Sequence, residues 1–381
     1  MKVVLPSAAP AASGEGLVPY TLGEPRAFGR PAGPAASRVA YAAAHVVPDP
    51  FGDSLDWDTT LAFREHLWSY GLGVAEAMDT AQRGMGLDWS VTRELILRSG
   101  AAARARGGLI ACGAGTDQLP PGPASLKTIV AAYEEQLAVV AEAGAVPILM
   151  ASRQLAAAAT GPDDYAEVYG RLLSQLERPA ILHWLGPMFD PALEGYWGTP
   201  DLDAAAAAVL DVIREHAAKV DGIKVSLLDA GREIDLRRRL PDSVRLYTGD
   251  DFNYPDLIRG DEHGHSDALL GVFDPIAPAA AAALHALDAN DLDAYEEAFA
   301  PTLPLARHIF EAPTYYYKTG VVFLAWLSGH QSHFRMVGGL ESARSVPHLV
   351  RLFQLADGLY PDPELAAARM RAWLTVQGVP Q

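Results

Sequence analysis

The chain has 381 residues, of which 50% are hydrophobic, and a formal net charge of -17. This length supports a large buried core without covalent cross-links. The single cysteine, Cys112, excludes an intramolecular disulfide and any multi-cysteine metal site, and we expect it to be a small buried residue on a strand. The negative charge would repel a phosphate backbone or an anionic lipid surface, so neither nucleic acid nor membrane is an expected partner.

The N-terminal part of the sequence is irregular in composition. Residues 1–37 are rich in Pro, Gly, Ala and Ser around one short apolar patch, LVPYTL, and predict an irregular N-terminal arm. The first residues lack the continuous apolar segment of a signal peptide, and no later stretch has about 18 uncharged apolar residues in a row. We therefore expect a cytoplasmic protein.

From Arg38 onward, short apolar runs alternate with amphipathic stretches, which is the pattern of repeated βα units. The eight strand candidates are residues 39–47, 72–78, 108–114, 145–151, 179–185, 222–228, 244–249 and 268–274. Several of the helical patterns between them follow Asp, Ser or Thr residues that cap helices. Eight units in one run favour an α/β fold with a closed (β/α)8 TIM barrel over residues 38–290, rather than a doubly wound sheet. Residues 291–381 predict a C-terminal helical extension packed on the barrel.

In such a barrel the active site forms at the C-terminal ends of the strands, so polar residues that close an apolar run are the candidates. They are His45, Asp79, Thr80, Gln82, Ser152, Arg153, His183, Trp184, Lys224, Ser226, Asp250 and Asp251. We interpret Asp250 equally well as a cap of the next helix.

Lys224 differs from the other candidates because it lies inside an apolar strand pattern, GIKVSLL. Burial of an ammonium lowers its pKa, and a neutral amine is a nucleophile toward ketones and aldehydes. The other lysines of the chain are Lys2, Lys127, Lys219 and Lys318. None of these others lies within a strand pattern. The alternative is a strand lysine paired with a carboxylate such as Asp79 or Asp251.

The segment VDGIKVS, followed by YTGDD, resembles strands 6 and 7 of the dihydrodipicolinate synthase / N-acetylneuraminate lyase superfamily of Schiff-base aldolases. PAILHW stands at the family's fifth strand, and LDWDTTLAFREHLWSYGLGVAEAMDTAQRGMGLDWSVTRELI follows its first two units. ALHALDANDLDAYEEAF and TYYYKTGVVFLAWLSG are similar to its C-terminal helices, so residues 38–370 resemble a divergent branch of the family. The resemblance implies that Lys224 forms the imine, that Gly249 and Asp251 close strand 7 beside the substrate, and that the chain forms a homo-oligomer. It implies no cofactor.

The departures from the family pattern bear on the substrate. His183 stands where the family has a tyrosine that relays protons, and an imidazole with a pKa near 6.5 acts as acid or base at neutral pH. We therefore predict His183 as the general acid/base; a histidine bonded to a backbone carbonyl is the alternative. The family loop GTTGE, which holds the substrate carboxylate, is DTAQR here, at residues 79–83. Asp79 would repel a carboxylate and is better suited to binding hydroxyl groups.

These departures favour a polyhydroxylated keto substrate, or a keto acid whose carboxylate is held by Arg153. The family's tyrosine pair after strand 4 is also missing, since MASRQLA stands there. The predicted catalytic residues are Lys224, His183 and Thr80. The predicted substrate-binding residues are Asp79, Gln82, Arg153, Trp184, Ser226, Gly249, Asp251 and His45.

Two other groups of residues have a simpler interpretation. The histidines of DEHGHSD, His263 and His265, have a spacing compatible with a metal site that includes His45, His183 and Asp79, but loop histidines usually face solvent. The aromatic residues Tyr315 to Tyr317 and Trp326 predict helix packing. Lys318 reaches an active site only if its helix crosses the barrel mouth.

The sequence therefore predicts a Schiff-base-forming lyase, a retro-aldolase or dehydratase, that acts on a small carbonyl compound without a metal. Two alternatives stay open. One is a metal-dependent barrel isomerase or epimerase, and the other is a barrel that binds a sugar or keto acid without turnover.

Overall fold

The computed structural model describes residues 2–7, 16–52 and 54–381. Eight parallel strands close into a barrel in the order β10-β3-β4-β5-β6-β7-β8-β9. The strands are β3 (Ala40–Ala43), β4 (Gly73–Glu76), β5 (Ile110–Ala114), β6 (Val146–Leu149), β7 (Ala180–Leu185), β8 (Val220–Ser226), β9 (Arg245–Thr248) and β10 (Asp267–Leu270). Each coincides with one predicted strand, so the predicted TIM barrel is confirmed.

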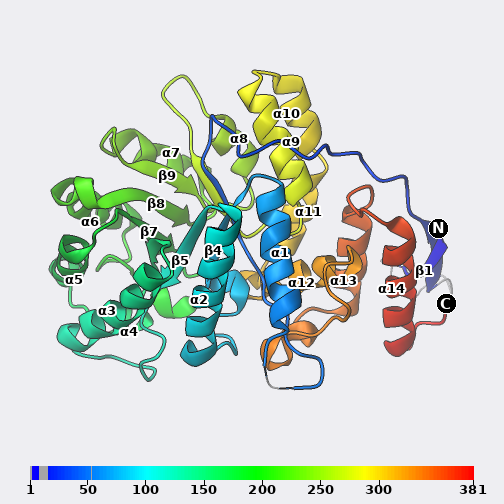
Figure 1. Cartoon of the computed structure of the whole chain (residues 1–381), viewed down its shortest axis with the longest axis horizontal. Helices are drawn as coiled ribbons and strands as arrows, with labels where there is room; N and C mark the ends of the chain where they lie inside the picture. The colour runs from blue at the N-terminus through cyan, green and yellow to red at the C-terminus, as the bar shows by residue number, and fades with distance from the viewer. Residues whose placement is uncertain (1, 8–15, 53) are drawn as a thin grey trace.

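The helices between the strands form the outer layer of the barrel (Figure 1). They are α1 (Trp57–Ser69), α2 (Trp89–Arg106), α3 (Leu126–Glu142), α4 (Arg153–Ala158), α5 (Pro162–Gln175), α6 (Leu202–Glu215), α7 (Ala230–Arg239), α8 (Tyr254–Arg259) and α9 (Ala277–Asp288). The expected caps are present, because the side chains of Asp56, Asp88 and Ser125 accept hydrogen bonds from the first turns of α1, α2 and α3. None of the helices in the described ranges is both long and apolar enough to span a membrane.

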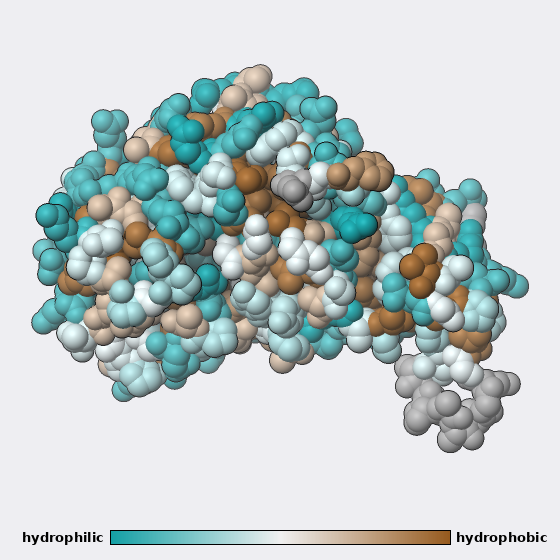
Figure 2. Space-filling view, turned by 90° about the horizontal axis from the view of Figure 1, so that it is seen from below, coloured by the Kyte–Doolittle hydropathy of each residue, from teal (hydrophilic) through white to brown (hydrophobic). Residues whose placement is uncertain are grey.

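Two separate apolar layers fill the fold, because successive side chains of a strand point to opposite faces. The inner layer, inside the barrel, consists of Tyr41, Ala43, Ala75, Met78, Ala111, Ile148, Met150, Ile181, Tyr247 and Leu269. The outer layer lies between the strands and the helices and continues into the C-terminal extension. On the face seen in Figure 2, polar side chains predominate and apolar ones form scattered groups.

The N-terminal arm is less irregular than predicted. Lys2–Pro6 (β1) and Leu17–Thr21 (β2) form a two-stranded antiparallel sheet, and the arm from residue 22 to residue 39 has no helix or strand. Val3 and Leu5 are buried, and the side chain of Gln381 bonds the backbone of Val4, so both ends of the chain meet beside α14 (Figure 1). The composition of residues 1–37 did not predict this sheet, because the sheet depends on contacts with the C-terminal end of the chain, which is distant in sequence.

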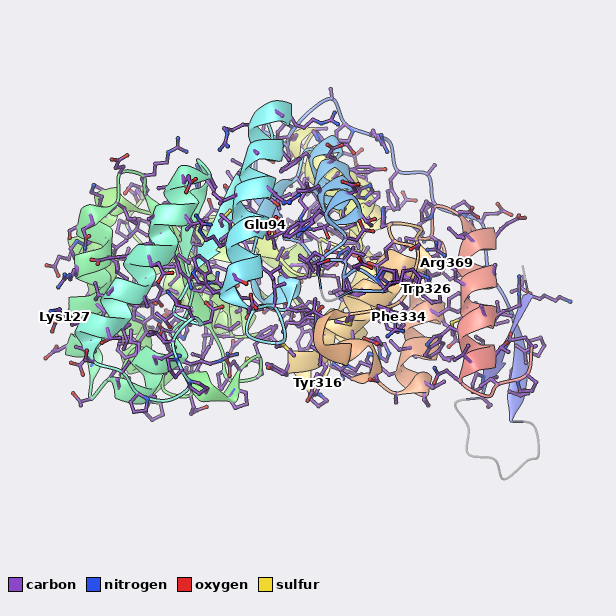
Figure 3. The ribbon with its side chains drawn as sticks, turned by 60° about the horizontal axis from the view of Figure 1, so that its bottom comes forward. Glu94, Lys127, Tyr316, Trp326, Phe334 and Arg369 are labelled. Atoms are coloured by element: carbon purple, nitrogen blue, oxygen red, sulfur yellow. The ribbon has the colours of Figure 1, made fainter. Side chains whose placement is uncertain are left out.

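The C-terminal extension consists of α10 (Leu292–Phe299), α11 (Thr302–Ile309), α12 (Tyr317–Leu327), α13 (Val346–Leu355) and α14 (Pro363–Val376). Trp326 stacks on Phe334 with ring centroids 5.9 Å apart, and the Arg369 guanidinium lies 5.8 Å from the Trp326 ring (Figure 3). Trp326 is therefore a packing residue, as predicted. In Figure 1 the barrel forms one end of the molecule and α14 the other, with α12 and α13 between them.

A buried ion pair joins the first two βα units. Arg64 of α1 donates to both carboxylate oxygens of Glu76 on β4, at 2.8 and 2.9 Å, and both side chains are fully buried. Ser99 of α2 donates to the same carboxylate at 2.6 Å. Burial alone would raise the pKa of Glu76, but the Arg64 charge and these hydrogen bonds outweigh it and lower the pKa below its usual 4.5.

We predict that Arg64→Met lowers the free energy of unfolding by about 3–5 kcal/mol, because it leaves the Glu76 carboxylate buried without a cation. Urea denaturation would measure this loss. Arg106→Met is the matched control, since it breaks an exposed pair with Glu65 and should cost about 1 kcal/mol or less. Equal losses in the two variants would contradict the role given to the buried pair.

Candidate active site

Lys224 and His183 face each other inside the barrel. They are direct partners in the parallel pairing of β8 with β7. Ile181, two residues before His183, belongs to the inner apolar layer, so His183 points inward as well. Lys224 is 7% exposed and His183 fully buried. An amine and an imidazole therefore lie side by side at the C-terminal ends of neighbouring strands.

The surroundings of this pair favour uncharged forms. Burial lowers the pKa of Lys224, and the carboxylates of Asp79 and Asp251 oppose the shift only in part. Burial, aided by the Lys224 charge, also lowers the pKa of His183 well below 6.5. The imidazole is therefore neutral near pH 7 and has no imidazolium proton to donate. The role of His183 as general acid/base stays a prediction.

Ser226 and Gly249 shape the space around Lys224. The Ser226 hydroxyl lies 3.4 Å from Nε2 of His183. A Cβ atom at Gly249 would lie 2.8 Å from Cε of Lys224 and collide with the Ser226 hydroxyl. The absence of a side chain at Gly249 thus leaves room for the lysine, whereas the sequence had predicted substrate contact for this residue.

The two acidic residues after β9 have different roles. Asp250 accepts hydrogen bonds from the backbone N–H groups of Phe252 and Asn253, at 2.9 and 3.1 Å, and holds the turn before α8. Asp251 accepts from the backbone N–H of Val272 at 2.9 Å, and burial raises its pKa despite this bond and the nearby Lys224. Asp251 therefore belongs to the Lys224 group, and Asp250 is a capping residue.

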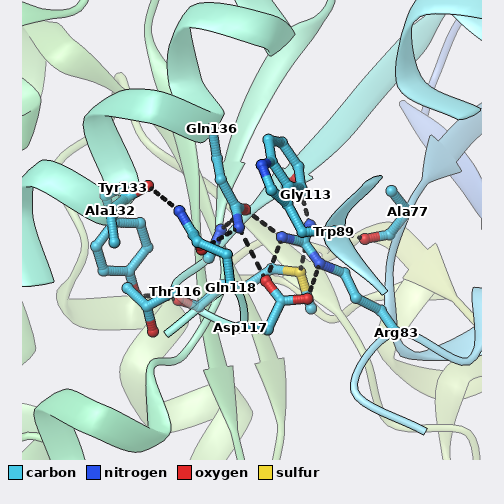
Figure 4. Close-up of polar contacts among 12 residues, drawn as sticks. Ala77, Arg83, Trp89, Gly113, Thr116, Asp117, Gln118, Ala132, Tyr133 and Gln136 are labelled. Carbon is cyan, nitrogen blue, oxygen red and sulfur yellow. Dashed lines mark hydrogen bonds and ion pairs between the residues drawn. The ribbon is translucent and has the colours of Figure 1, made fainter. Parts of the chain in front are cut away.

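The loop that carries Asp79 and Thr80 is anchored by the Arg83 network (Figure 4). Arg83 donates to Asp117 at 2.9 and 2.6 Å, to the carbonyl oxygen of Gly113 at 2.6 Å, and also to Gln136. This network fastens the loop after β4 to the loop after β5 and to α3. Asp79 and Thr80, in the single turn Asp79–Ala81, are thereby held at the rim.

Tyr317 is a residue of the site that the sequence analysis assigned only to packing. Its hydroxyl lies 2.8 Å from Oγ1 of Thr80, and its ring stacks on Phe310 with centroids 4.5 Å apart. Burial raises its pKa well above 10, with smaller contributions from Asp79 and Asp251, the two carboxylates that act on Lys224. Tyr317 is thus a buried phenol at the barrel mouth, contributed by the first residue of α12.

Lys318 also lies at the barrel mouth. Its helix, α12, therefore reaches the mouth, which was the condition for Lys318 to take part in the site. It is buried, and its ammonium lies 4.9 and 4.7 Å from the ring centres of Tyr315 and Tyr317. Burial lowers its pKa to about 8, with Asp79 opposing the shift. Asp79 therefore acts on two buried lysines, Lys224 and Lys318. The effect of Asp79 on Lys318 could not be predicted from the sequence, because the two residues lie far apart along the chain.

A cavity of about 320 Å³ opens over the C-terminal ends of β4 to β7, and Asp79 and Arg153 line it. Arg153 donates through Nε to Asp190 at 2.5 Å, and a side chain at Gly84, where φ is +70°, would lie 2.8 Å from its Nη1. The volume lies within the range of small-molecule sites, roughly 300–1,000 Å³. Arg153 therefore lines the cavity as one half of an ion pair with Asp190, which also lines it, whereas Lys224 and His183 are not among the lining residues.

Three predicted substrate-binding residues lie outside the Lys224 group. The amide of Gln82 exchanges hydrogen bonds with the backbone of Val337 at 2.8 and 3.1 Å and fastens the C-terminal extension to the rim. Trp184 points outward, against α6 and α7, because its neighbour His183 points inward. Nδ1 of His45 lies 2.7 Å from Asp274. In this structure the contacts of these three residues are with other parts of the protein around the site.

The alternative metal site, which would combine His263 and His265 with residues at the barrel mouth, does not form. His263 and His265 lie in the loop before β10, at the N-terminal end of the barrel, opposite His45, His183 and Asp79. Among the residues that the structure describes, the side chains grouped closely enough to hold a metal ion lie elsewhere, in the C-terminal extension.

Solved structures with the same fold belong to the dihydrodipicolinate synthase family. One is YagE, an E. coli K12 prophage protein of this family in complex with pyruvate, with 13% identity, a TM-score of 0.66, and coverage of 84% of this chain and 99% of that one. Dihydrodipicolinate synthase from Bacteroides thetaiotaomicron has 16% identity, a TM-score of 0.64, and coverage of 84% and 99%. The enzyme from Aquifex aeolicus has 14% identity, a TM-score of 0.60, and coverage of 90% and 99%. At these identities the likeness establishes the fold.

No curated protein matches the chain in sequence. The resemblance predicted from the strand 6 and strand 7 motifs is confirmed at the level of the fold, which is that of the dihydrodipicolinate synthase family. A family model described as "Protein of unknown function (DUF993)" matches residues 8–379, and the chain therefore belongs to this family.

Proposed function

We propose that the protein is a Schiff-base-forming lyase in which Lys224 condenses with a ketone or aldehyde. The observation that carries this proposal is the burial of Lys224 beside a neutral His183 and between two carboxylates. A lowered lysine pKa leaves more of the nucleophilic amine at neutral pH.

The proposed reaction begins with attack of the Lys224 amine on the carbonyl carbon, followed by loss of water to give a protonated imine. In retro-aldol cleavage a base removes the proton of the β-hydroxyl group, the carbon–carbon bond breaks, and its electron pair moves to the imine to form an enamine. Protonation of this enamine regenerates an imine. In dehydration, loss of the α-proton gives the enamine, whose electron pair expels the β-hydroxyl, which takes up a proton and leaves as water, and an α,β-unsaturated imine remains. In both branches, addition of one water to the imine releases the product and the Lys224 amine.

The electrostatics of the site support one assignment of the proton transfers. His183 is neutral and accepts the proton. Tyr317 keeps its proton because its pKa is raised, and its hydrogen bond to Thr80 gives a relay of two hydroxyl groups at the mouth. Asp79 and Asp251 orient substrate hydroxyl groups.

The charges near the site support one class of substrate. Asp79 disfavours a carboxylate beside the reacting carbonyl, whereas Arg153 lines the same cavity and can pair with an anionic group there if that group replaces Asp190. We therefore propose a polyhydroxylated keto compound, or a keto acid whose carboxylate pairs with Arg153. Pyruvate is the natural first probe, since it is bound in YagE.

We predict that borohydride traps a covalent adduct on Lys224 when the protein is incubated with its carbonyl substrate. Intact-mass spectrometry with pyruvate, other keto acids and keto sugars would measure the adduct, and peptide mapping would locate it. Lys224→Ala should abolish the adduct. Lys318→Ala tests the second buried lysine, and Lys127→Ala, at an exposed lysine on the outer edge of the barrel (Figure 3), is the control. Turnover without an adduct, retained in Lys224→Ala, would refute the proposal.

We predict that the initial rate of trapping by cyanoborohydride rises with pH to a midpoint below 10.5, because the attacking form is the neutral amine and burial lowers the pKa of Lys224. The rate is measured from pH 6 upward with a fixed, saturating carbonyl compound. A midpoint at 10.5 or above would contradict the environment assigned to the lysine.

Tyr317→Phe should lower turnover by about 10²- to 10⁴-fold, the usual contribution of a positioned proton donor, while the Lys224 adduct still forms. Steady-state kinetics and adduct trapping on the same preparation separate the two effects. Tyr316→Phe is the matched control, because Tyr316 is the neighbouring phenol and is only half-buried, whereas Tyr317 is buried; Tyr316 is labelled in Figure 3. Equal turnover in both variants would remove Tyr317 from the mechanism.

A further inference from the structure

Three potential metal ligands meet where α11 ends and α13 begins. His308 lies in the last turn of α11, His348 in the first turn of α13, and Glu311 in the loop that follows α11. Nδ1 of His308 and Nδ1 of His348 lie 3.3 and 2.9 Å from the two carboxylate oxygens of Glu311. One ligand atom from each residue lies within 4.8 Å of the others.

The hydrogen bonding of His308 fixes where its free electron pair points. Its Nε2 lies 2.9 Å from the backbone carbonyl oxygen of His348, and a carbonyl only accepts, so Nε2 carries the proton. In the neutral ring, Nδ1 then carries the lone pair, and it lies 3.3 Å from a carboxylate oxygen of Glu311. A proton on Nδ1 or a metal ion shared with the carboxylate would offset the repulsion between these two acceptors. A carbonyl that accepts from the second nitrogen is also the usual support of a metal-binding histidine.

His348 adds a second incompletely satisfied imidazole. Its Nδ1 contacts the Glu311 carboxylate, and its Nε2 is buried without a hydrogen-bond partner among the described residues. The two rings stack with centroids 4.1 Å apart and an interplanar angle of 21°, so both present Nδ1 to the same carboxylate. The side chain of Glu311 is 49% exposed, which leaves solvent access to the group.

The surrounding backbone is already held in place. The guanidinium of Arg344 donates to the carbonyl oxygens of Glu311 and Pro313, at 2.8 and 3.0 Å. The loop therefore needs little further ordering to present Glu311. The group lies outside the barrel and is separate from the Lys224 site.

We propose that His308, Glu311 and His348 bind one divalent transition-metal ion such as Zn²⁺. Two imidazoles and one carboxylate are a ligand set for such ions, with water in the remaining position, whereas Mg²⁺ and Ca²⁺ prefer oxygen ligands alone. Because the two rings are nearly parallel, binding of one ion requires them to turn until both Nδ1 lone pairs point at it.

The ion would link α11 to α13 and fix the segment that leads to the barrel mouth. Phe310, between His308 and Glu311, stacks on Tyr317, whose hydroxyl bonds Thr80. The role assigned to the metal is thus to hold the segment that carries Tyr317. It takes no part in bond breaking.

The test uses tag-free, full-length protein stripped with EDTA and dialysed. Calorimetric titration with Zn²⁺ should show one site, Co²⁺ should give the visible absorption bands of a site with nitrogen ligands, and both ions should raise the melting temperature. His348→Ala and Glu311→Gln should each weaken Zn²⁺ binding by about tenfold or more. His263→Ala, at an exposed loop histidine, is the matched control and should bind as the wild type does.

Glu311→Gln keeps the shape of a half-exposed side chain, so it tests the site even where His348→Ala fails to fold. The proposal is wrong if the wild type binds neither Zn²⁺ nor Co²⁺, which would make the group an imidazolium–carboxylate pair. It is also wrong if Glu311→Gln binds as tightly as the wild type, because the ion then lies elsewhere.

Discussion

Burial of the Lys224 ammonium inside a closed barrel is the constraint that organises this structure. A charge removed from water is costly unless opposite charges and hydrogen bonds compensate it. The inner layer of the barrel is apolar and cannot compensate the ammonium charge. The compensating charges are the carboxylates of Asp79, after β4, and Asp251, after β9, at the C-terminal ends of the strands. The need for these carboxylates fixes where the loops must lie, and their incomplete compensation leaves the lysine with a lowered pKa.

The loop after β4 illustrates how this placement is enforced. Its last residue, Arg83, binds Asp117 and Gln136 in the neighbouring βα unit. The Arg83 network thus holds Asp79 close enough to Lys224 and Lys318 for its charge to raise the pKa of both lysines. The strand that precedes this loop is anchored in the same way, by the buried pair of Arg64 and Glu76.

The features that were predicted correctly from the sequence are those that depend on the pattern of neighbouring residues. The eight strands and the inward direction of Lys224 follow from strand length, apolar content and alternation. The same alternation could have excluded Trp184, because neighbours on a strand cannot both face the interior and His183 already does. Gly249 lies beside Lys224, as predicted, and the structure adds that a Cβ atom at this position would collide with the lysine side chain.

Tyr317 and Lys318 could not be found in this way, because no periodicity within α12 shows that its first turn closes the mouth of a barrel formed by other residues. Helix caps and strand patterns can be predicted from neighbouring residues. The hydrogen bond between Thr80 and Tyr317, in contrast, joins residues 237 positions apart. The β1–β2 sheet was missed for the same reason. Contacts of this kind require the packed structure.

The two buried lysines beside Asp79 differ in a way that separates their roles. Lys318 donates to the carbonyl oxygen of Tyr315 at 3.2 Å and lies over two aromatic rings, contacts that favour its charged form. With a pKa of about 8 it remains mostly protonated at pH 7. Lys224 instead lies beside a neutral imidazole, which offers no such stabilisation of charge. The C-terminal extension therefore supplies a fixed cation and a phenol at the mouth, while the barrel supplies the amine suited to attack a carbonyl group.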